Sequence, residues 1–491
     1  MMQTRERIWE RLRAAFSGVA LSVALASCST VSLDQIGFGE HKSEDPAVTA
    51  LPAAQRKEHE RLIATYGGIY RAPELQALME QTIARLVAAS EKPELKYRIT
   101  ILNSPAINAF ALPGGSLYVT RGLISLANDT SELSSVISHE MAHVLARHAV
   151  IREEQIRAAV LNSRAISDTL SDPQLGALAL ARSRLSIATF SRGQELEADA
   201  VGVGIAARAG YDPYGASRFL TSMGRFAQLR TASIGASPSK DMDFLSSHPS
   251  TPERISIAVA NAKQFVNPLS TERDRETFLK ALDGVTFGDD PKEGFVRGRT
   301  FLHPNLGFAF TAPEGFALEN TAQAVLGATG SGREALRLDA VRVSGSEPLA
   351  DYVSKGWVEG VDLSTLEKFE VNGFEAATAI ARGEQWSFRL YAIRFGADVY
   401  RLAFATRELS PQLEASFRQA ALSFRRVPLD EAQAIRPLRI RIHQVTAGDT
   451  PERIAARMAY ADRQLERFLV LNGLRRGARL TPGDYVKLVV E

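Results

Sequence analysis

The sequence has little cysteine and no marked excess of charge of either sign. Cys28 is the only cysteine among 491 residues, which excludes an intramolecular disulfide. Lysine and arginine total 58 against 56 aspartates and glutamates, a formal net charge of +2. Because the basic excess typical of nucleic-acid-binding proteins is missing, we expect no nucleic-acid partner. With 45% hydrophobic and 23% charged residues the composition is that of an ordinary globular protein, and the length predicts two to four domains.

The N-terminal region lacks an apolar run long enough to span a bilayer. Residues 14–26 are apolar and follow several arginines, a pattern that predicts an export signal over residues 1–27. The L-A-S-C segment that ends at Cys28 resembles the bacterial lipoprotein cleavage box, which implies lipid on Cys28 and a membrane as partner. Ser29, rather than an aspartate, favours the outer membrane, so the expected location is the periplasm. The mixed, polar residues 28–50 are expected to be a tether. An ordinary signal peptide with a chance cysteine is the alternative.

Histidine is also scarce, but two of the eight histidines stand four residues apart in a helical run. His139 and His143 flank Glu140 in an H-E-x-x-H segment, so both imidazoles lie on one helix face and can bind one Zn²⁺. A catalytic zinc site needs a third protein ligand and a water, and Glu140 can take the proton from that water. Asp129 and Glu132 can cap the start of this helix. The segment therefore predicts a zinc-dependent peptidase, with a chance occurrence of the motif as the alternative.

Two short strands are expected before this helix. Residues 97–102 alternate as a strand, and a bend at Pro113-Gly114-Gly115 leads into a second strand over residues 116–120. The segments on either side of the bend are expected to form an antiparallel pair near the zinc helix. An open edge there can hold an extended polypeptide substrate as an added strand. A hairpin that only supports the core is the alternative. The residues assigned to this edge are Asn108, Ala109, Phe110, Ala111 and Leu112.

The third metal ligand is expected on a second helix. Glu195 and Asp199 are four residues apart and share a helix face, and small residues such as Gly202 let this helix approach another closely. Glu195 can complete a His₂Glu ligand set, and Asp199 can accept a hydrogen bond from a ligand imidazole. Glu197 is expected only to favour the helix dipole. His148, on a continuation of the first helix but offset from the ligand pair, is interpreted as structural. A solvated acidic helix start is the alternative.

Together these segments resemble the gluzincin family of the CAAX prenyl protease, an HtpX-like group, and within it the soluble periplasmic branch. The resemblance covers about residues 50–265. It is more specific than the short motif alone because four segments occur in the family's order. They are H-E-x-x-H at 139–143, the stretch 108–115, E-x-x-A-D at 195–199, and S-H-P at 247–249 with Arg254.

The resemblance implies roles for individual residues. His139, His143 and Glu195 are implied to bind one zinc ion per chain, with Glu140 as the catalytic base. In the soluble branch a histidine placed like His248 can approach the zinc as an extra ligand, which would close the site to water. The alternative for His248 is a loop residue that precedes a helix start.

The C-terminal part of the chain changes in pattern. Residues 288–428 predict antiparallel strands without a catalytic constellation and faintly resemble the small α/β domain of the photosystem II oxygen-evolving P protein and of Ran-binding Mog-type proteins. We interpret this part as a scaffold or partner-binding domain. Residues 438–491 resemble a LysM module, a βααβ unit, which implies binding to the glycans of peptidoglycan. A degenerate module that only packs or binds protein is the alternative.

The expected architecture is an α+β multidomain chain. A mainly helical peptidase domain with a small antiparallel sheet covers residues 51–270, followed by an α/β antiparallel-sheet domain over 288–428 and the LysM-like domain over 438–491. The expected function is that of a zinc-dependent endopeptidase of the bacterial cell envelope, and the resemblance implies misfolded or unassembled envelope proteins as substrates. Two alternatives stay open. One is a non-catalytic or latent chaperone or anchor lipoprotein that links outer membrane and peptidoglycan, and the other is a peptidoglycan hydrolase.

Overall fold

A computed structural model of the chain describes residues 53–170, 191–234, 248, 251–265 and 274–491, apart from 346, 356, 384 and 461. The predicted signal peptide and tether, with Cys28, lie outside the described residues. The described residues divide into two compact units. Among the described residues, the first unit contains residues 53–233, those between 248 and 290, and residues 436–491, and the second contains residues 291–435. No helix in the described part of the chain has the length and apolar character needed to cross a membrane.

The first unit contains a three-stranded sheet in the order β1-β3-β2, with β1 at Arg98–Leu102, β2 at Ala109–Ala111 and β3 at Ser116–Thr120. β2 and β3 pair antiparallel around the predicted bend, where Gly115 has φ of +82° and a Cβ atom would lie 2.1 Å from the Lys96 carbonyl oxygen. β1 and β3 pair in parallel. The expectation of a purely antiparallel small sheet is therefore wrong. Although β3 follows β2 in the chain, it lies between β1 and β2 in the sheet and runs parallel to β1. β2 is left as an edge strand.

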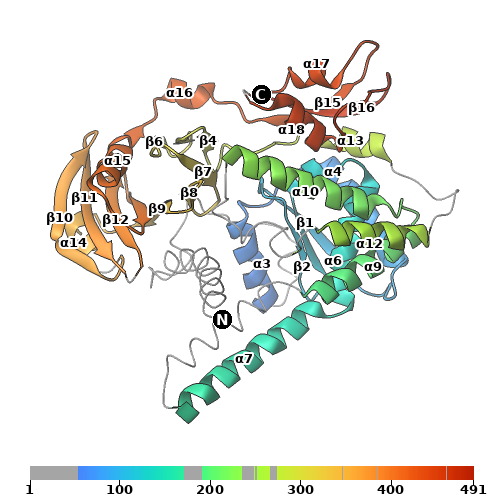
Figure 1. Ribbon diagram of the computed structural model, residues 1–491, viewed down its shortest axis with the longest axis horizontal. Coiled ribbons are helices and arrows are strands. Elements are labelled where there is room, and N and C mark those ends of the chain that lie inside the picture. Colours follow the sequence, from blue (N-terminus) through green and yellow to red (C-terminus); the bar gives the residue numbers. More distant parts are fainter. Residues whose placement is uncertain are drawn as a thin grey trace, which may run out of the picture. The chain divides into compact units, whose positions relative to one another are not determined.

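Helices surround this sheet (Figure 1). The central helix is α6, whose residues from Thr130 to His143 are all buried, and its N-cap Asp129 accepts a hydrogen bond from the Glu132 backbone, as predicted. α6 ends at Leu145, and α7 starts afresh at His148 and runs outward from the rest of the unit. The described helices of this part are α3 (Ala53–Thr65), α4 (Pro73–Ala88), α5 (Arg121–Leu126), α6 (Thr130–Leu145), α7 (His148–Leu170), α9 (Arg192–Arg208), α10 (Gly215–Ile234), α12 (Pro252–Lys263) and α13 (Arg275–Leu282).

The C-terminal module, residues 436–491, belongs to the first unit. Its elements follow the order strand, helix, helix, strand: β15 (Arg439–Gln444), α17 (Pro451–Ala455), α18 (Gln464–Leu471) and β16 (Tyr485–Val490), with β15 and β16 antiparallel. Apolar residues of the module, such as Ile440 and Phe468, share one continuous core with Leu133 and Ile137 of α6. The module is thus packed against the body of the unit, which the sequence-based division into separate domains does not anticipate. Its assignment as a LysM-like domain stays a prediction.

The second unit is built from antiparallel sheets, as predicted. Seven strands pair in the order β10-β11-β12-β13-β9-β8-β7, and four more pair in the order β14-β6-β5-β4. Separate apolar clusters cover the two faces of the larger sheet. The elements are β4 (Phe295–Arg297), β5 (Thr300–His303), β6 (Phe308–Thr311), β7 (Phe316–Asn320), β8 (Val325–Thr329), β9 (Glu334–Arg342), α14 (Leu349–Ser354), β10 (Val361–Val371), β11 (Phe374–Arg382), β12 (Ser387–Phe395), β13 (Asp398–Thr406), α15 (Pro411–Leu422), β14 (Arg425–Arg426) and α16 (Leu429–Ala434).

Candidate metal centre

Four side chains converge beside α6 in the first unit. His139 and His143 come from α6, Glu195 comes from α9, and His248 comes from the chain just before α12. Each offers one nitrogen or oxygen atom, and these atoms lie within 4.8 Å of one another. Each side chain is at most 5% exposed. The structure therefore brings together the three residues predicted as metal ligands and His248, for which an extra-ligand role and a plain loop role were both left open.

The convergence depends on close packing between α6 and α9. Gly202 of α9 faces the backbone of α6, where a Cβ atom would lie only 2.9 Å from the His139 nitrogen and 3.1 Å from its Cα. Glu195 lies two turns before Gly202 and therefore on the same face of α9, toward α6. The sequence suggests that small residues of this helix allow close packing. At Gly202 a residue without a side chain is needed, because α9 contacts the backbone of α6 there.

The spacing of the donor atoms fits a tetrahedral metal ion. His139 Nε2 lies 3.1 Å from His143 Nε2 and 3.3 Å from His248 Nδ1. Glu195 Oε1 lies 3.5 Å from His143 Nε2 and 2.8 Å from His248 Nδ1. Metal–ligand bonds of about 2.0–2.1 Å in a tetrahedron put neighbouring ligand atoms about 3.3–3.4 Å apart. Imidazole nitrogens with one carboxylate oxygen are a donor set that suits Zn²⁺.

The ionisation states of His143 and Glu195 also suit a metal. Burial, with the neighbouring His139, lowers the pKa of His143 to about 3, so this imidazole is neutral and can donate a lone pair. Burial alone would raise the pKa of Glu195, but hydrogen bonds with His143 and His248 hold that pKa below the usual range. Glu195 is therefore an ionised carboxylate.

Glu140 lies beside the donor cluster without being part of it. Its Oε1 is 3.7 Å from His248 Nε2 and accepts no hydrogen bond from the described residues. Burial raises the pKa of Glu140, while the neighbouring His248 and His139 and, to a smaller extent, a backbone hydrogen bond from Ala111 of β2 oppose this shift. A carboxylate with a raised pKa is a better proton acceptor, which is the property required of a general base.

The edge strand β2 meets the centre through that hydrogen bond. Its residues Ala109, Phe110 and Ala111 pair with β3 on one side only. The two outer residues of the predicted edge differ in their environment. The buried amide of Asn108 donates to the Tyr66 hydroxyl at 2.9 Å, so this side chain is used in the core, whereas Leu112 is partly exposed. The backbone of β2, more than the Asn108 side chain, is thus placed to meet a substrate.

Asp199 and Arg254 contact the predicted ligands His139 and Glu195. Asp199 Oδ1 lies 2.9 Å from His139 Nδ1, the position expected from its spacing to Glu195. Arg254 of α12 binds both oxygens of Asp199 at 2.8 Å and also lies 2.9 Å from Glu195 Oε2. Burial would raise the pKa of Asp199, but Arg254 and His139 lower it to about 2. The sequence places Arg254 in a family motif but gives no reason to expect this double contact.

His148 lies closer to the centre than predicted. Its Nδ1 is 2.9 Å from His143 Nδ1, and its Nε2 is 3.4 Å from Glu197 Oε2. The expectation that His148 continues the same helix at an offset is wrong, because Arg147 adopts φ of +57° and turns the chain. The turn brings the His148 ring back against His143. No glycine or proline marks this break, so the sequence carries no signal for it.

The site combines two histidines one turn apart on a helix, a glutamate from a second helix and the Glu140 carboxylate beside them. This combination is typical of a metallopeptidase site. Residues 71–262 match the family model described as Peptidase family M48. The predicted family resemblance is thereby confirmed.

Curated relatives match part of the chain. The beta-barrel assembly-enhancing protease of Yersinia pestis is 32% identical over 200 residues, 39% of this chain and 40% of the relative. The protein of the same name from Escherichia coli K12 is 29% identical over 204 residues, 40% of each chain. The mitochondrial metalloendopeptidase OMA1 of Schizosaccharomyces pombe is 31% identical over 179 residues, 36% of this chain and 50% of the relative. The chain thus spans about two fifths to one half of the length of these relatives.

A solved structure from Bacteroides thetaiotaomicron aligns with 30% of this chain and 53% of its own, at 12% identity and a TM-score of 0.22. So low a score carries no argument about the fold.

Proposed function

We propose that the chain is a zinc-dependent endopeptidase in which His139, His143 and Glu195 bind the ion and Glu140 is the general base. The observation that carries this proposal is the convergence of buried donor atoms at tetrahedral spacing, with Glu140 beside them. When bound, the zinc ion supplies Lewis-acid polarisation of the scissile carbonyl and lowers the pKa of the attacking water.

The residues of the chain do the rest of the chemistry. Glu140 accepts a proton as the water oxygen forms its bond to the carbonyl carbon, and then delivers that proton to the amide nitrogen as the C–N bond breaks. Asp199 holds His139 through Nδ1 and His148 holds His143 through Nδ1, which leaves both Nε2 atoms facing the centre. An extended polypeptide that pairs with the free edge of β2 would lie alongside Glu140.

His248 occupies the position of a fourth ligand. With Nδ1 at 3.3 Å from His139 Nε2 and 2.8 Å from Glu195 Oε1, it would take the place of the water in a catalytic site. We therefore propose that this arrangement is latent, and that His248 has to leave before the site can turn over. This contact is also what favours the alternative of a latent or non-catalytic chaperone or anchor. In a His248→Ala variant that keeps its zinc, we expect faster cleavage, and an unchanged rate would contradict the gating role.

The setting of the reaction comes from the sequence and the relatives. We propose one zinc ion per chain, an exported protein that is lipid-anchored through Cys28 in the periplasm and held at the outer membrane, and peptidoglycan as a further partner of the LysM-like domain. Misfolded or unassembled envelope proteins are the proposed substrates. The name of the beta-barrel assembly-enhancing proteases, which match residues of this chain at 29–32% identity, supports this choice.

One comparison separates the proposals. The mature protein and its Glu140→Gln variant are each loaded with zinc and offered an unfolded protein and purified peptidoglycan. Glu140-dependent cleavage of the unfolded protein at one bound zinc per chain supports the endopeptidase. Cleavage of peptidoglycan alone favours the hydrolase, and zinc binding without cleavage of either favours the non-catalytic anchor.

A further inference from the structure

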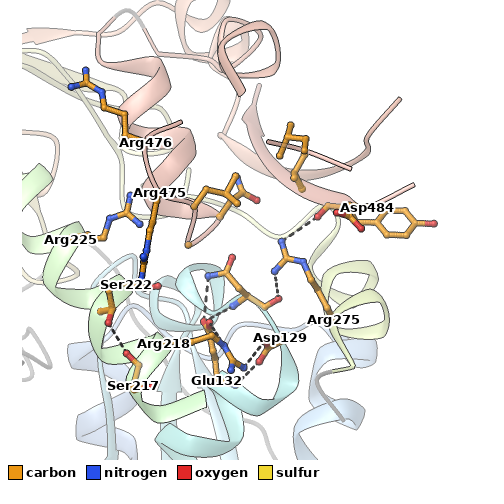
Figure 2. Close-up of a pocket in the computed structure, with 18 of the residues that line it drawn as sticks. Asp129, Glu132, Ser217, Arg218, Ser222, Arg225, Arg275, Arg475, Arg476 and Asp484 are labelled. Atoms are coloured by element: carbon orange, nitrogen blue, oxygen red, sulfur yellow. Dashed lines mark hydrogen bonds and ion pairs between the residues drawn. The ribbon is translucent and has the colours of Figure 1, made fainter. Parts of the chain in front are cut away.

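A second site lies in the first unit, where the C-terminal module meets α6 and α10. It is a pocket of about 790 Å³, within the range of small-molecule sites. One wall is the start of α6 with Asp129 and Glu132, another is the α10 face from Ser217 to Arg225, and the third is the module loop between α18 and β16. Figure 2 shows these three walls around one space. None of the metal-centre residues is among the described residues that line it.

The walls of this pocket are fixed to one another by buried contacts. The Lys487 ammonium of β16 is fully buried and donates to the carbonyl oxygens of Ser125 at 2.8 Å and Ala127 at 2.7 Å. Arg275 bridges the two sides, with bonds to the Asn128 carbonyl at 2.7 Å and the Tyr485 carbonyl at 3.2 Å. The pocket is therefore a built feature of the unit.

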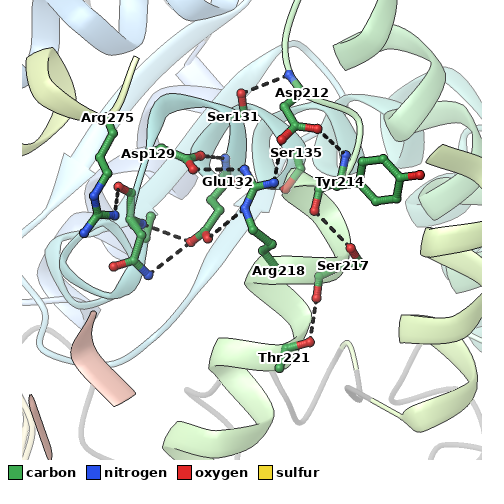
Figure 3. Close-up of polar contacts among 12 residues, drawn as sticks. Asp129, Ser131, Glu132, Ser135, Asp212, Tyr214, Ser217, Arg218, Thr221 and Arg275 are labelled. Atoms are coloured by element: carbon green, nitrogen blue, oxygen red, sulfur yellow. Dashed lines mark hydrogen bonds and ion pairs between the residues drawn. The ribbon is translucent and has the colours of Figure 1, made fainter. Parts of the chain in front are cut away.

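The charge of the lining is strongly positive, with six arginines and three carboxylates. Part of this charge is already neutralised. Arg218 makes ion pairs with Asp129 at 2.9 Å, Asp212 at 2.7 Å and Glu132 at 3.4 Å, as Figure 3 shows. The Asp129 and Glu132 carboxylates of the pocket lining are thus already paired with Arg218.

Four of the remaining five arginines, all except Arg275, have no partner among the described residues. The side chains of Arg225, Arg475, Arg476 and Arg479 make no ion pair or hydrogen bond with any residue that the structure describes. Figure 2 shows the side chains of Arg225 and Arg475 next to each other, while Arg476 points away. Burial, and then the charge of Arg475, lowers the pKa of Arg225. Two guanidinium groups held together in this way repel each other, and an anion placed between them would remove the repulsion.

We propose that this pocket binds a small polyanion whose phosphate or carboxylate groups are held between Arg225 and Arg475. Guanidinium groups bind both kinds of anion through paired hydrogen bonds, so the shared chemistry is that of a planar or tetrahedral oxyanion. Arg225 belongs to α10 and Arg475 to the module, so a bound anion ties the module to the helices of the peptidase part. Because α6 starts at this pocket and carries His139 and His143 further along, the anion also stabilises the helix of the metal centre.

The test uses the full mature protein and two probes at constant ionic strength, fructose 1,6-bisphosphate for phosphates and tricarballylate for carboxylates. Isothermal titration calorimetry measures affinity and stoichiometry. We expect saturable binding of at least one probe at one per chain, with the preferred probe identifying the anion chemistry, and a rise in Tm on binding. Failure of both probes to bind saturably overturns the proposal.

Variants locate the binding. An Arg225→Gln/Arg475→Gln double variant is expected to lose at least tenfold in affinity, while Arg457→Gln, on an exposed arginine of the same module outside the pocket, stays within twofold of wild type. Equal losses in the double variant and in Arg457→Gln, or no loss in either, contradict the assignment. Should the double variant fail to fold, the single Arg475→Gln change in the exposed loop is measured instead, with an expected loss of at least threefold.

Discussion

Gly202 of α9 lies in direct contact with the backbone of His139 in α6: a Cβ atom at residue 202 would be 2.9 Å from the His139 nitrogen. This relationship sets the distance between the two helices that carry the proposed zinc ligands. The metal centre is therefore defined by backbone packing as much as by its polar side chains.

A Gly202→Ala substitution tests this packing directly. The methyl group would meet backbone atoms that cannot move aside, so α9 has to shift away from α6 and carry Glu195 with it. We expect at least a tenfold loss of zinc affinity and a lower Tm, measured by competition with a chelator and by thermal unfolding. Gly193→Ala, in the first turn of the same helix with only an ordinary contact to Ser191, is the control and should leave zinc affinity unchanged. Equal affinities in both variants would show that the helix contact does not position the ligands.

His148 is predicted to orient a zinc ligand. Its contact with His143 Nδ1 at 2.9 Å fixes the ring that presents Nε2 to the centre, and such outer contacts contribute about 10- to 100-fold in metal affinity. We therefore expect His148→Ala to bind zinc about 10-fold more weakly or worse, with the fold retained. His443→Ala in the C-terminal module is the matched change, and it should have no effect on zinc. A wild-type zinc affinity in His148→Ala would show that His148 does not orient the ligand and has only a structural role.

Glu132 is predicted to make stability depend on pH. Burial and then Asp129 raise its pKa to about 7, although Arg218 and Lys487 oppose this shift. The folded protein therefore binds this proton more tightly than the unfolded chain, whose glutamate titrates near pH 4.3–4.5. The resulting stability is fully present below about pH 4.5 and is lost as the pH rises to about 7.

The measurement is the free energy of unfolding of wild type and Glu132→Gln between pH 4.5 and 8. We expect the wild type to lose stability relative to the variant as the pH rises through this window, because the amide does not ionise. Glu74→Gln, on an exposed glutamate of α4, should run parallel to wild type. A pH-independent difference between Glu132→Gln and wild type would mean that Glu132 titrates normally.

Lys487 is predicted to hold the C-terminal module in place. Its ammonium is fully buried and donates to the carbonyls of Ser125, Leu126 and Ala127 at the end of α5. Replacing it with methionine removes this donor from the three carbonyls, of which Leu126 keeps a bond from Asn128 Nδ2 at 3.2 Å, at a cost of about 1–3 kcal/mol for each buried group that stays unsatisfied. We expect Lys487→Met to lower the free energy of unfolding by about 2 kcal/mol or more and to make residues 436–491 more sensitive to limited proteolysis. Lys92→Met, on an exposed lysine, is the control. An unchanged proteolysis pattern would show that the module is held by its apolar core alone.

The sequence predicts those parts of the site that depend on helix periodicity. His139, Glu140 and His143 follow from the 3.6-residue repeat, and Glu195 with Asp199 follows from the same repeat on a second, small-residue helix. The antiparallel strands of the second unit likewise follow from their alternating pattern and their turns.

Tertiary contacts account for what the sequence does not predict. The parallel pairing of β1 and β3 depends on which side of β3 the chain places β2, and alternation within a strand is the same for both choices. The contact of His148 depends on a left-handed Arg147 that no glycine signals. The burial of Lys487 depends on docking of a module more than 300 residues away in the chain, where an alternating strand would ordinarily leave a lysine in water.

We propose that α6 and α9 together form one zinc site. The zinc affinity of Glu195→Gln tests this proposal most directly. Wild type and Glu154→Gln, an exposed glutamate of α7, serve as references with zinc content measured by mass spectrometry after dialysis against a graded chelator. We expect one zinc per chain in both references and at least a tenfold weaker zinc affinity in Glu195→Gln, with loss of cleavage. Equal zinc affinity in all three proteins would contradict it.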